Sequence, residues 1–300
     1  MRRILVIRLG ALGDFAQSFA PFAAIRDHHR NDSVTLLTTA PFVELARASP
    51  WFDDVRVDAR APWRNLRAVI AMRALLRQYD FIYDLQTSGR TTRYFHLSGH
   101  RAWSGIASGA QAVHDNPQRK AMHNRARQRD QLRRAGIAEV PDADVSWLAG
   151  YGPRLPEPYV LLVPGTSAAH PIKRWPVERF AGLATRLWAR GLRPVVIGTQ
   201  ADAPLAAVIT AACDATLDLT GRTSLLDLGG LAARAAAAVG NDTGPMHLAA
   251  VMGTPSVVLF SRAGDPALSA PLGRTPGQVR VLWAQELATL HIDRVAAALR

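Results

Sequence analysis

The architecture of this chain is indicated first by residues 4–26, which read ILVIRLGALGDFAQSFAPFAAIR. The apolar run Ile4–Ile7 predicts a buried strand. A turn containing Gly10 and Gly13 follows it, and we expect a helix from Asp14 to Asp27. A buried strand, a glycine turn and a helix form the first half of a βαβ unit, so this segment predicts an α/β fold.

The same alternation recurs along the 300 residues. Apolar runs predict strands at 34–38, 55–57, 81–85, 159–163, 194–197, 235–239 and 256–260. Helical spacing predicts helices at 64–77, 176–190, 205–212 and between the last two strands. Strands that alternate with helices favour parallel sheets covered on both faces. Two such series of strands and helices need two sheets. The segment 141–158, which contains several prolines, is the best candidate for the linker between them. We therefore expect domains at 1–150 and 151–300.

Composition limits the classes of protein and of site. Hydrophobic residues make up 48% of the chain and charged residues 20%, which argues against disorder. The single cysteine, Cys213, excludes a disulfide framework and a cysteine zinc site. We find no His/Asp cluster with metal-ligand spacing, no G-x-S-x-G and no Walker A lysine. The net charge of +12 favours an anionic partner: nucleic acid, an acidic membrane or a phosphorylated substrate.

Two segments resemble membrane signals but are better explained otherwise. Met1-Arg2-Arg3 precedes an apolar run as in a signal peptide, but Arg8 and Asp14 interrupt that run. Residues 243–261 form a long uncharged stretch, as a membrane span would. They contain two prolines and two glycines, so we expect a buried helix, turn and strand instead of a span. A cytoplasmic protein is therefore expected.

The loop after the first strand, Arg8–Asp14, is the first candidate binding loop, because ligands bind at the carboxyl ends of strands in open α/β sheets. Gly10 and Gly13 would allow a ligand to approach the backbone. The spacing is not G-x-G-x-x-G and no acidic residue ends the second strand, so a dinucleotide-dependent oxidoreductase is disfavoured. Asp14 is either a helix N-cap, which residue preferences favour, or a general base.

Two loops in the second half suit phosphate. Thr166 and Ser167 follow the strand at 159–163, and Lys173 and Arg174 stand just before a helix. Hydroxyls and a flexible cation suit phosphate oxygens, although a solvated basic turn is an equal reading for Arg174. The second loop runs from Gly240 to His247, where Asp242 or Thr243 could cap a helix whose free N–H groups would face a pyrophosphate. His247, one turn into that helix, either faces the same ligand or is structural.

These loops, in this order, resemble glycosyltransferase family 9, the ADP-heptose:lipopolysaccharide heptosyltransferases. The resemblance rests on residues 4–26, on YDLQTSGRT and WSGIA, and on PGTS…KRWP and GNDTGPMHLAAVMGTPSVVLF. It implies the GT-B architecture, with two Rossmann-like doubly wound domains that face each other across a cleft. Domain 1–150 would bind the acceptor and domain 151–300 the nucleotide-sugar donor, and the last helix could pack back on the first domain.

The resemblance also assigns residues to roles. Asp14 matches the family's catalytic base, and Lys173 matches the lysine that contacts the donor phosphate during catalysis. Asp242, Thr243, Gly244 and His247 match the nucleotide-sugar loop. Thr166 and Ser167 match the hydroxyl pair near the phosphates, with a longer spacing to the lysine in this sequence. Either Gln200 or Asp202 would hold the donor ribose.

The acceptor side is indicated by charge. Residues 1–150 hold 22 Lys+Arg against 14 Asp+Glu, whereas residues 151–300 hold 14 against 10. A basic cluster with Arg119, Lys120, Arg125 and Arg129 lies in the first half, and we expect it, with Gly13, to meet acceptor phosphates or carboxylates. Anionic lipid and a solvated helix face remain alternatives for the cluster.

The resemblance therefore implies an inverting transfer of heptose from ADP-heptose to a lipid A-linked lipopolysaccharide core acceptor, without a metal or other cofactor. A family member with another nucleotide-sugar donor is the alternative. A nucleic-acid-binding protein is remote, because aromatics are only 7% of the chain and do not interleave with the basic cluster. We expect a cytoplasmic enzyme with peripheral contact at the inner membrane and no nucleic-acid partner.

Overall fold

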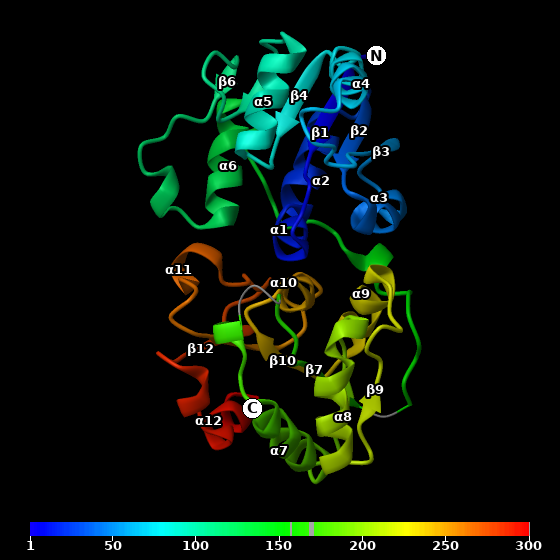
Figure 1. The fold of residues 1–300 in the computed structure, drawn as a ribbon, viewed down its shortest axis with the longest axis vertical. Coiled ribbons are helices and arrows are strands. Elements are labelled where there is room, and N and C mark those ends of the chain that lie inside the picture. The colour runs from blue at the N-terminus through cyan, green and yellow to red at the C-terminus, as the bar shows by residue number, and fades with distance from the viewer. Residues whose placement is uncertain (157, 168–170, 300) are drawn as a thin grey trace. The chain divides into compact units, whose positions relative to one another are not determined.

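The computed structural model describes residues 1–156, 158–167 and 171–299. It divides into two compact units, Met1–Asp144 and Val145–Arg300, and each unit contains a six-stranded sheet whose neighbouring strands are all parallel (Figure 1). The α/β class and the two doubly wound sheets that the sequence predicts are confirmed.

The sheet of the first unit has the order β3-β2-β1-β4-β5-β6. Its strands are β1 (Arg3–Ile7), β2 (Ser33–Thr38), β3 (Asp54–Val57), β4 (Phe81–Asp84), β5 (Trp103–Gly105) and β6 (Ala112–Val113). Ile4–Ile7 of β1 are fully buried, because β1 lies between β2 and β4 and helices cover both of its faces.

The helices of the first unit form two groups. On one face, α4 (Leu66–Leu76) packs with α5 (Gly89–Ser98) over a core that includes Leu5 and Ile7. The other group consists of α1 (Leu12–Gln17), α2 (Phe19–His28) and α6 (Asn124–Arg134), which contact one another. A short helix, α3 (Val43–Ala48), packs against β3.

The single helix expected from Asp14 to Asp27 is two helices, and it starts earlier than predicted. Ser18 stands between α1 and α2. Pro21, in the first turn of α2, has no N–H to offer the carbonyl four residues earlier, so the α-helical ladder cannot continue from α1.

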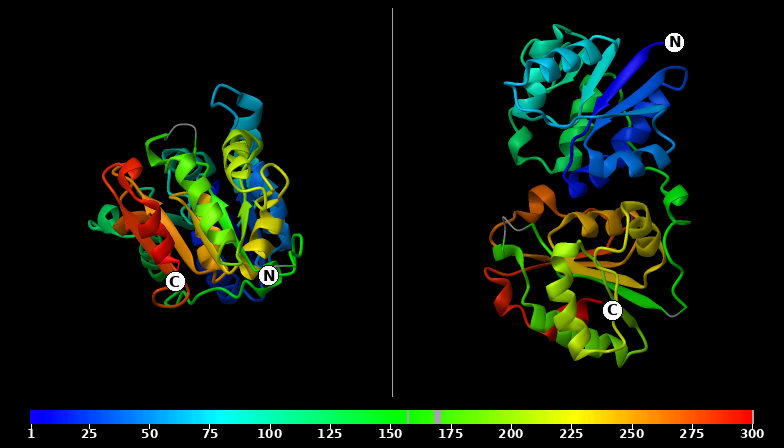
Figure 2. Two further views of the ribbon diagram at one scale, coloured as in Figure 1. Left: turned by 90° about the horizontal axis from the view of Figure 1, so that it is seen from below. Right: turned by 45° about the vertical axis from the view of Figure 1, so that its right-hand side comes forward.

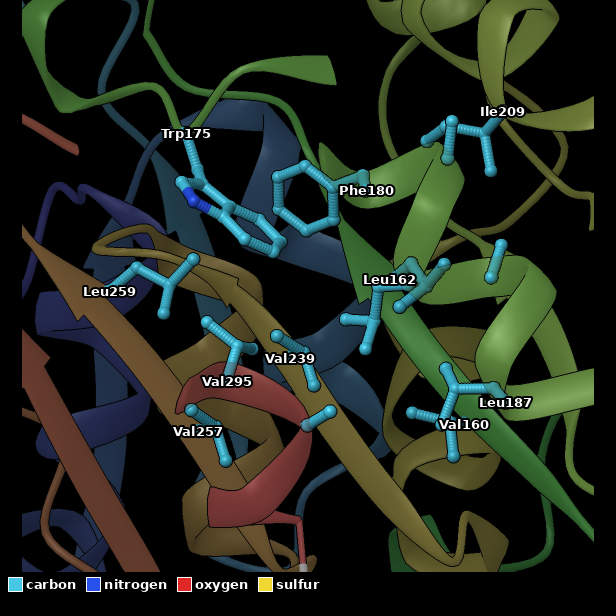
Figure 3. Packing of buried hydrophobic residues seen from close by; sticks show 14 of the residues in the cluster. Val160, Leu162, Trp175, Phe180, Leu187, Ile209, Val239, Val257, Leu259 and Val295 are labelled. Carbon is cyan, nitrogen blue, oxygen red and sulfur yellow. The ribbon is translucent and has the colours of Figure 1, made fainter. Parts of the chain in front are cut away.

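The sheet of the second unit has the order β12-β11-β10-β7-β8-β9. Its strands are β7 (Tyr159–Val163), β8 (Arg193–Val196), β9 (Leu217–Asp218), β10 (Ala237–Asn241), β11 (Ser256–Phe260) and β12 (Val279–Trp283). Alternate residues of the buried strands serve different faces, so Val160 and Leu162 of β7 point to one core (Figure 3).

Helices also cover both faces of the second sheet (Figures 1 and 2). The group α7 (Val177–Trp188), α8 (Ala203–Ala212) and α12 (Ile292–Ala298) covers the core in Figure 3, where Trp175 stacks edge-on against Phe180 at 4.9 Å between ring centroids. The opposite group contains α9 (Leu225–Arg234) and α10 (Gly244–Val251), and α11 (Pro266–Ser269) follows β11.

The last helix, α12, packs within the second unit. Val295 and Ala296 of α12 are buried in the core of the second unit, and α12 packs against α7. Burial of this apolar face holds the helix in its own unit.

In both units the order of the strands in the sheet determines which loops lie next to each other. In each unit the chain builds outward on one side of its first strand and then crosses to the other side, so the order reverses between β1 and β4, and between β7 and β10. Loops that leave adjacent parallel strands at such a reversal diverge and form a crevice for ligands. In the described residues, no helix combines the length and the apolar character needed to cross a membrane.

Candidate functional site

The loop between β1 and α1 is held in place by its neighbours. The N–H of Leu9 donates to Gln86 Oε1 at 2.8 Å, and the Leu9 carbonyl accepts from Thr39 Oγ1 at 3.1 Å and Arg60 Nη2 at 2.7 Å. Gly10 has φ +112°, and a Cβ there would lie 2.7 Å from the ring of Phe42. Glycine is therefore required at this position, and the loop is fixed ahead of Asp14.

Asp14 is not the helix cap that residue preferences favour. Helix α1 starts at Leu12 with Ala11 in the N-cap position, so Asp14 lies in the first turn. Its side chain is 39% exposed. Oδ1 accepts a hydrogen bond from Asn124 Nδ2 at 3.2 Å and lies 3.4 Å from Arg8 Nη2. Within the described part of the chain both contacts go to Oδ1, which leaves Oδ2 as the atom able to accept a proton.

Arg8 lies beside Asp14 and is itself held by a hydrogen bond to the backbone. The guanidinium is buried and donates to the carbonyl of Leu85 at the end of β4. Burial lowers the pKa of Arg8, and the charges of Asp14 and Asp84 oppose that shift. Arg8 therefore interacts electrostatically with two carboxyl groups at the reversal of the sheet order.

Asp84 is the second of these carboxyl groups and is completely buried at the end of β4. Its Oδ1 accepts from the backbone N–H groups of Gln86 at 3.1 Å and Thr87 at 2.9 Å, whereas Oδ2 has no hydrogen-bond partner among the described residues. Burial raises the pKa of Asp84 to about 6, against the lowering effect of these hydrogen bonds and of Arg8.

The predicted acceptor residues do not lie together. Gly13 directly precedes Asp14 in α1, and Arg119 Nη2 donates to Thr87 Oγ1 at 2.7 Å in the loop after β4. Arg125 forms an ion pair with Asp142 and is only 13% exposed, so its charge is already neutralised. Lys120 and Arg129 are exposed. Of the four cations, Arg119 is thus the one in contact with a loop at the reversal.

A cavity of about 710 Å³ adjoins the same loop in the first unit. Its lining includes Leu9, Gly10, Ala11, Arg60 and Gln86. The cavity is open to solvent and its lining includes a cation, Arg60, so it suits part of an anionic saccharide.

In the second unit the structure brings together three of the predicted donor residues. Lys173 Nζ lies 2.6 Å from Asp242 Oδ2, and His247 Nε2 lies 3.9 Å from Asp242 Oδ1. All three side chains are largely buried, with Lys173 the most exposed at 20%. The trio forms at the reversal between β7 and β10, because Lys173 follows β7 and Asp242 follows β10.

Asn241 holds these two loops together. Its Nδ2 donates to the Pro164 carbonyl at 2.8 Å, and its Oδ1 accepts the N–H of Trp175 at 2.9 Å. The side chain is completely buried, so both bonds form in the absence of competing water. Asn241 therefore fixes the backbone on both sides of Lys173 relative to Asp242.

Thr243 occupies the N-cap position of α10, and Gly244 begins the helix. The Thr243 hydroxyl makes no cap bond and, among the described residues, has no hydrogen-bond partner although it is buried. The first N–H groups of a helix also lack partners within the helix. Uncompensated donors at a helix start favour an anion there.

The remaining predicted donor residues make other contacts. Thr166 Oγ1 accepts from Arg174 Nε at 2.9 Å, and Ser167 is exposed. Asp202 Oδ2 accepts from the N–H of Thr199 at 2.8 Å and from its hydroxyl at 2.9 Å, which closes a capping box. Gln200 is exposed and sits beside Gly221. The Asp202 carboxylate is thus engaged by its own turn, whereas nothing described engages Gln200 in the same way.

In the residues that the structure describes, no three His, Cys, Asp or Glu side chains group as metal ligands would. Positive charge at the loops after β7 and β10 comes from Lys173 and from the start of α10.

Sequence reasoning missed Arg8, Arg60, Asp84, Asn124 and Asn241 as site residues. Asn124 stands at the start of a helix rich in arginine. The sequence of this helix therefore indicates a basic cluster and gives no sign that the Asn124 amide contacts Asp14. Asp84 and Asn241 each end a buried strand, and a polar residue at such a strand end is a signal that could have marked them.

One protein-family model matches more than half of the chain. The model of "Glycosyltransferase family 9 (heptosyltransferase)" matches residues 110–297. Lipooligosaccharide heptosyltransferase 2 of Haemophilus influenzae is 31% identical over 142 residues, which cover 46% of this chain and 40% of that protein. The chain thus matches less than half the length of this curated relative.

Solved structures agree with the fold. The Escherichia coli ADP-heptose lipopolysaccharide heptosyltransferase II has a TM-score of 0.78 at 23% identity, over 99% of this chain and 97% of that chain. The E. coli heptosyltransferase WaaC, solved with ADP, has a TM-score of 0.81 at 18% identity, over 98% of each chain. This likeness places the two units in the GT-B fold class.

Proposed function

Since the chain belongs to glycosyltransferase family 9, the heptosyltransferase family, we propose that it transfers heptose from ADP-heptose to a lipid-linked saccharide of the lipopolysaccharide core. The observation that carries this proposal is Asp14, a half-exposed carboxylate held at one oxygen in the crevice of the first sheet. The first unit would bind the acceptor and the second the donor. Both substrates belong to the cytoplasmic side of the inner membrane, and nucleic acid has no role.

Asp14 would act as the general base. Its Oδ2 takes the proton from the acceptor hydroxyl as that oxygen attacks the anomeric carbon of the donor. The nucleotide leaves from the opposite face, so the configuration at that carbon inverts. A positioned base of this kind contributes about 10²–10⁴-fold in rate.

The donor diphosphate would bind where positive charge is concentrated in the second unit. Lys173, the start of α10 and the unpartnered Thr243 hydroxyl all suit phosphate oxygens. His247 would donate to the same group, and Gln200 is the better placed of the two candidates for the ribose, because Asp202 is engaged in its turn. ADP is the expected nucleotide, since the similar WaaC structure contains it.

Negative charge that develops on the leaving diphosphate would be stabilised by Lys173 and the helix start in the way that a metal ion acts in other transferases. We therefore propose that transfer needs no divalent metal. Full activity should persist in EDTA, and a rate that EDTA abolishes and Mg²⁺ restores would contradict this part of the proposal.

The acceptor would approach Asp14 along the side where the cavity of 710 Å³ and Arg60 lie, with Arg119 near the same loops. These two arginines are our candidates for contact with acceptor phosphates or carboxylates. The excess of 22 Lys+Arg over 14 Asp+Glu in residues 1–150 would favour approach of an anionic saccharide.

The donor is tested by thermal shift with ADP, GDP and UDP, followed by mass spectrometry of the product formed from ADP-heptose. We expect ADP alone to stabilise the protein. Stabilisation by UDP or GDP instead would favour the alternative, a family member with another donor.

Lys173→Ala should weaken ADP binding at least tenfold in calorimetry, because a charge-assisted contact to phosphate is lost. The only other lysine, Lys120, provides the matched control, and Lys120→Ala should bind ADP as the unchanged protein does. Equal ADP affinity of the two variants would argue against the role of Lys173.

A further inference from the structure

Helix α4, Leu66–Leu76, carries two large apolar side chains on its outer surface. Leu66 is 70% exposed and Ile70 is 68% exposed, which are among the highest values for large apolar residues in the described chain. The inner side of the helix already supplies the core, through Met72, Leu75 and the fully buried Leu76. Leu66 and Ile70 therefore do not serve the packing of the first unit.

Four exposed side chains of α4 and its C-cap form one line. Leu66, Ile70, Arg73 and Arg77 are separated by four, three and four residues, and this spacing places them along a single helical face. Apolar side chains occupy the first half of the line, and arginines occupy the second half. We refer to these four residues as the α4 ridge.

The segment of chain that carries the α4 ridge has charges of one sign. From Ala59 to Tyr79 the sequence contains no aspartate or glutamate, whereas Arg64, Arg67, Arg73 and Arg77 are all exposed. Among the residues that the structure describes, none of these four arginines forms an ion pair, although many arginines elsewhere do. Their charges are therefore available to a partner.

A surface that presents aliphatic side chains among unpaired cations has a specific complement. An anionic bilayer offers lipid phosphates to the arginines and an apolar boundary beneath them to Leu66 and Ile70. A protein partner fits less well, because a strip two apolar side chains long is far smaller than the core of a stable interface, which buries about 1,200–2,000 Å² in total. Arginine stems also reach past an apolar surface to place their charges at headgroup level.

We propose that the α4 ridge docks the first unit onto the surface of an anionic phospholipid bilayer. This proposal extends the proposed function. It rests on that function only for the purpose of docking, because a lipid-linked acceptor would be reached from the bilayer surface. Docking itself needs no donor, no acceptor and no catalysis. Leu66 and Ile70 are exposed whereas Leu76 is buried in the core, so the ridge lies on the outer side of α4.

The test is co-sedimentation of the full chain with vesicles of phosphatidylcholine alone or with 30% phosphatidylglycerol, a composition chosen to supply anionic headgroups, at about 0.1 M salt. We expect binding to the anionic vesicles only, and weaker binding as salt rises. L66S/I70S and R73Q/R77Q should each reduce the fraction bound at least fivefold. Equal binding of these variants and the unchanged protein would overturn the proposal.

Matched controls separate the ridge from general hydrophobicity and charge. V208S removes an exposed apolar side chain of α8, and R101Q/R294Q removes two exposed arginines elsewhere. Both controls should bind as the unchanged protein does. Loss of binding in R101Q/R294Q equal to that in R73Q/R77Q would show that net charge alone is responsible, and would overturn the role of α4.

Two further measurements keep the outcomes distinct. The melting temperature of each variant shows whether it is folded, and R73Q/R77Q serves if L66S/I70S is not. Transfer to a lipid-free saccharide acceptor should be unaffected by the ridge variants. Vesicle binding without any heptosyl transfer would retain the docking surface and reject the proposed function, whereas self-association that L66S/I70S abolishes, without vesicle binding, would overturn docking.

Discussion

At the scale of single residues, the side chain of Asp14 owes its position to two donors from different parts of the chain, Arg8 and Asn124. Asp14→Asn keeps the shape of the side chain but removes the base. We expect kcat to fall about 10²–10⁴-fold while ADP affinity stays within twofold, as measured by steady-state kinetics and calorimetry. Turnover near that of the unchanged enzyme would reject the assignment.

In the proposed mechanism Asn124 acts through Asp14, to which it donates a hydrogen bond, as a positioning residue. Asn124→Ala should lower kcat roughly ten- to hundredfold, because a small misplacement of a catalytic group is costly, while the acceptor KM and the melting temperature change little. Asn116 is a matched control in the same segment, since its Nδ2 donates to Asp130 instead. An equal loss in Asn116→Ala would show that the effect is structural.

Asp84 predicts a pH dependence of stability. Its folded pKa of about 6 lies above the usual 3.8, so the native state holds this proton more tightly than the unfolded state. The contribution to the free energy of unfolding is therefore complete below about pH 4 and is lost as pH rises through 6, at about 1.4 kcal/mol per pKa unit.

Asp84→Asn removes this titration. The melting temperature of the variant relative to the unchanged protein should accordingly be more favourable at pH 8 than at pH 5. Asp214→Asn, at an exposed turn, should show no such difference. A difference in melting temperature that is the same at both pH values would contradict the shifted pKa.

At the scale of elements, strands were more predictable than helices. Runs such as Ile4–Ile7 and Ser256–Phe260 are buried on both faces, so hydrophobicity alone marks them. Helix starts depend on local geometry: Gly10 with its positive φ lets α1 begin at Leu12, which no residue preference indicates. Helix α5 was missed because its apolar residues are few, although Ser88 and Thr91 form a capping box at its start.

The site was predictable to the extent that its residues follow strands. Lys173, Asp242 and His247 were all found from loops after strands, and the structure brings them together. Arg60 and Asn124 come from segments distant in sequence, and only the packing of the first unit brings them to the loop. Contacts of this kind leave no local pattern.

Asn241 links two elements and predicts a stability effect. Asn241→Ala would leave the Trp175 N–H and the Pro164 carbonyl without partners in a dry interior, at a cost of about 1–3 kcal/mol each. We expect a lower melting temperature in calorimetry and weaker ADP binding, because Lys173 is then less well fixed. Asn31→Ala, at an exposed position, should change neither.

At the scale of the whole molecule, the charge of +12 is unevenly divided, with the larger excess in residues 1–150. Attraction between exposed charges weakens as salt shortens the screening length from about 10 Å at 0.1 M. If this excess serves an anionic acceptor, the acceptor KM should rise severalfold between 0.05 and 0.3 M salt, as estimated from that screening. A KM independent of salt would place the excess outside acceptor binding.

The ion pair between Lys173 and Asp242 has a consequence for selectivity among anions. Asp242 already neutralises the lysine, so a phosphate would have to compete with this carboxylate for it. Inorganic phosphate brings little beyond that competition. In the proposed function a nucleotide would add contacts of its base and ribose, so the ion pair would favour nucleotides over free phosphate.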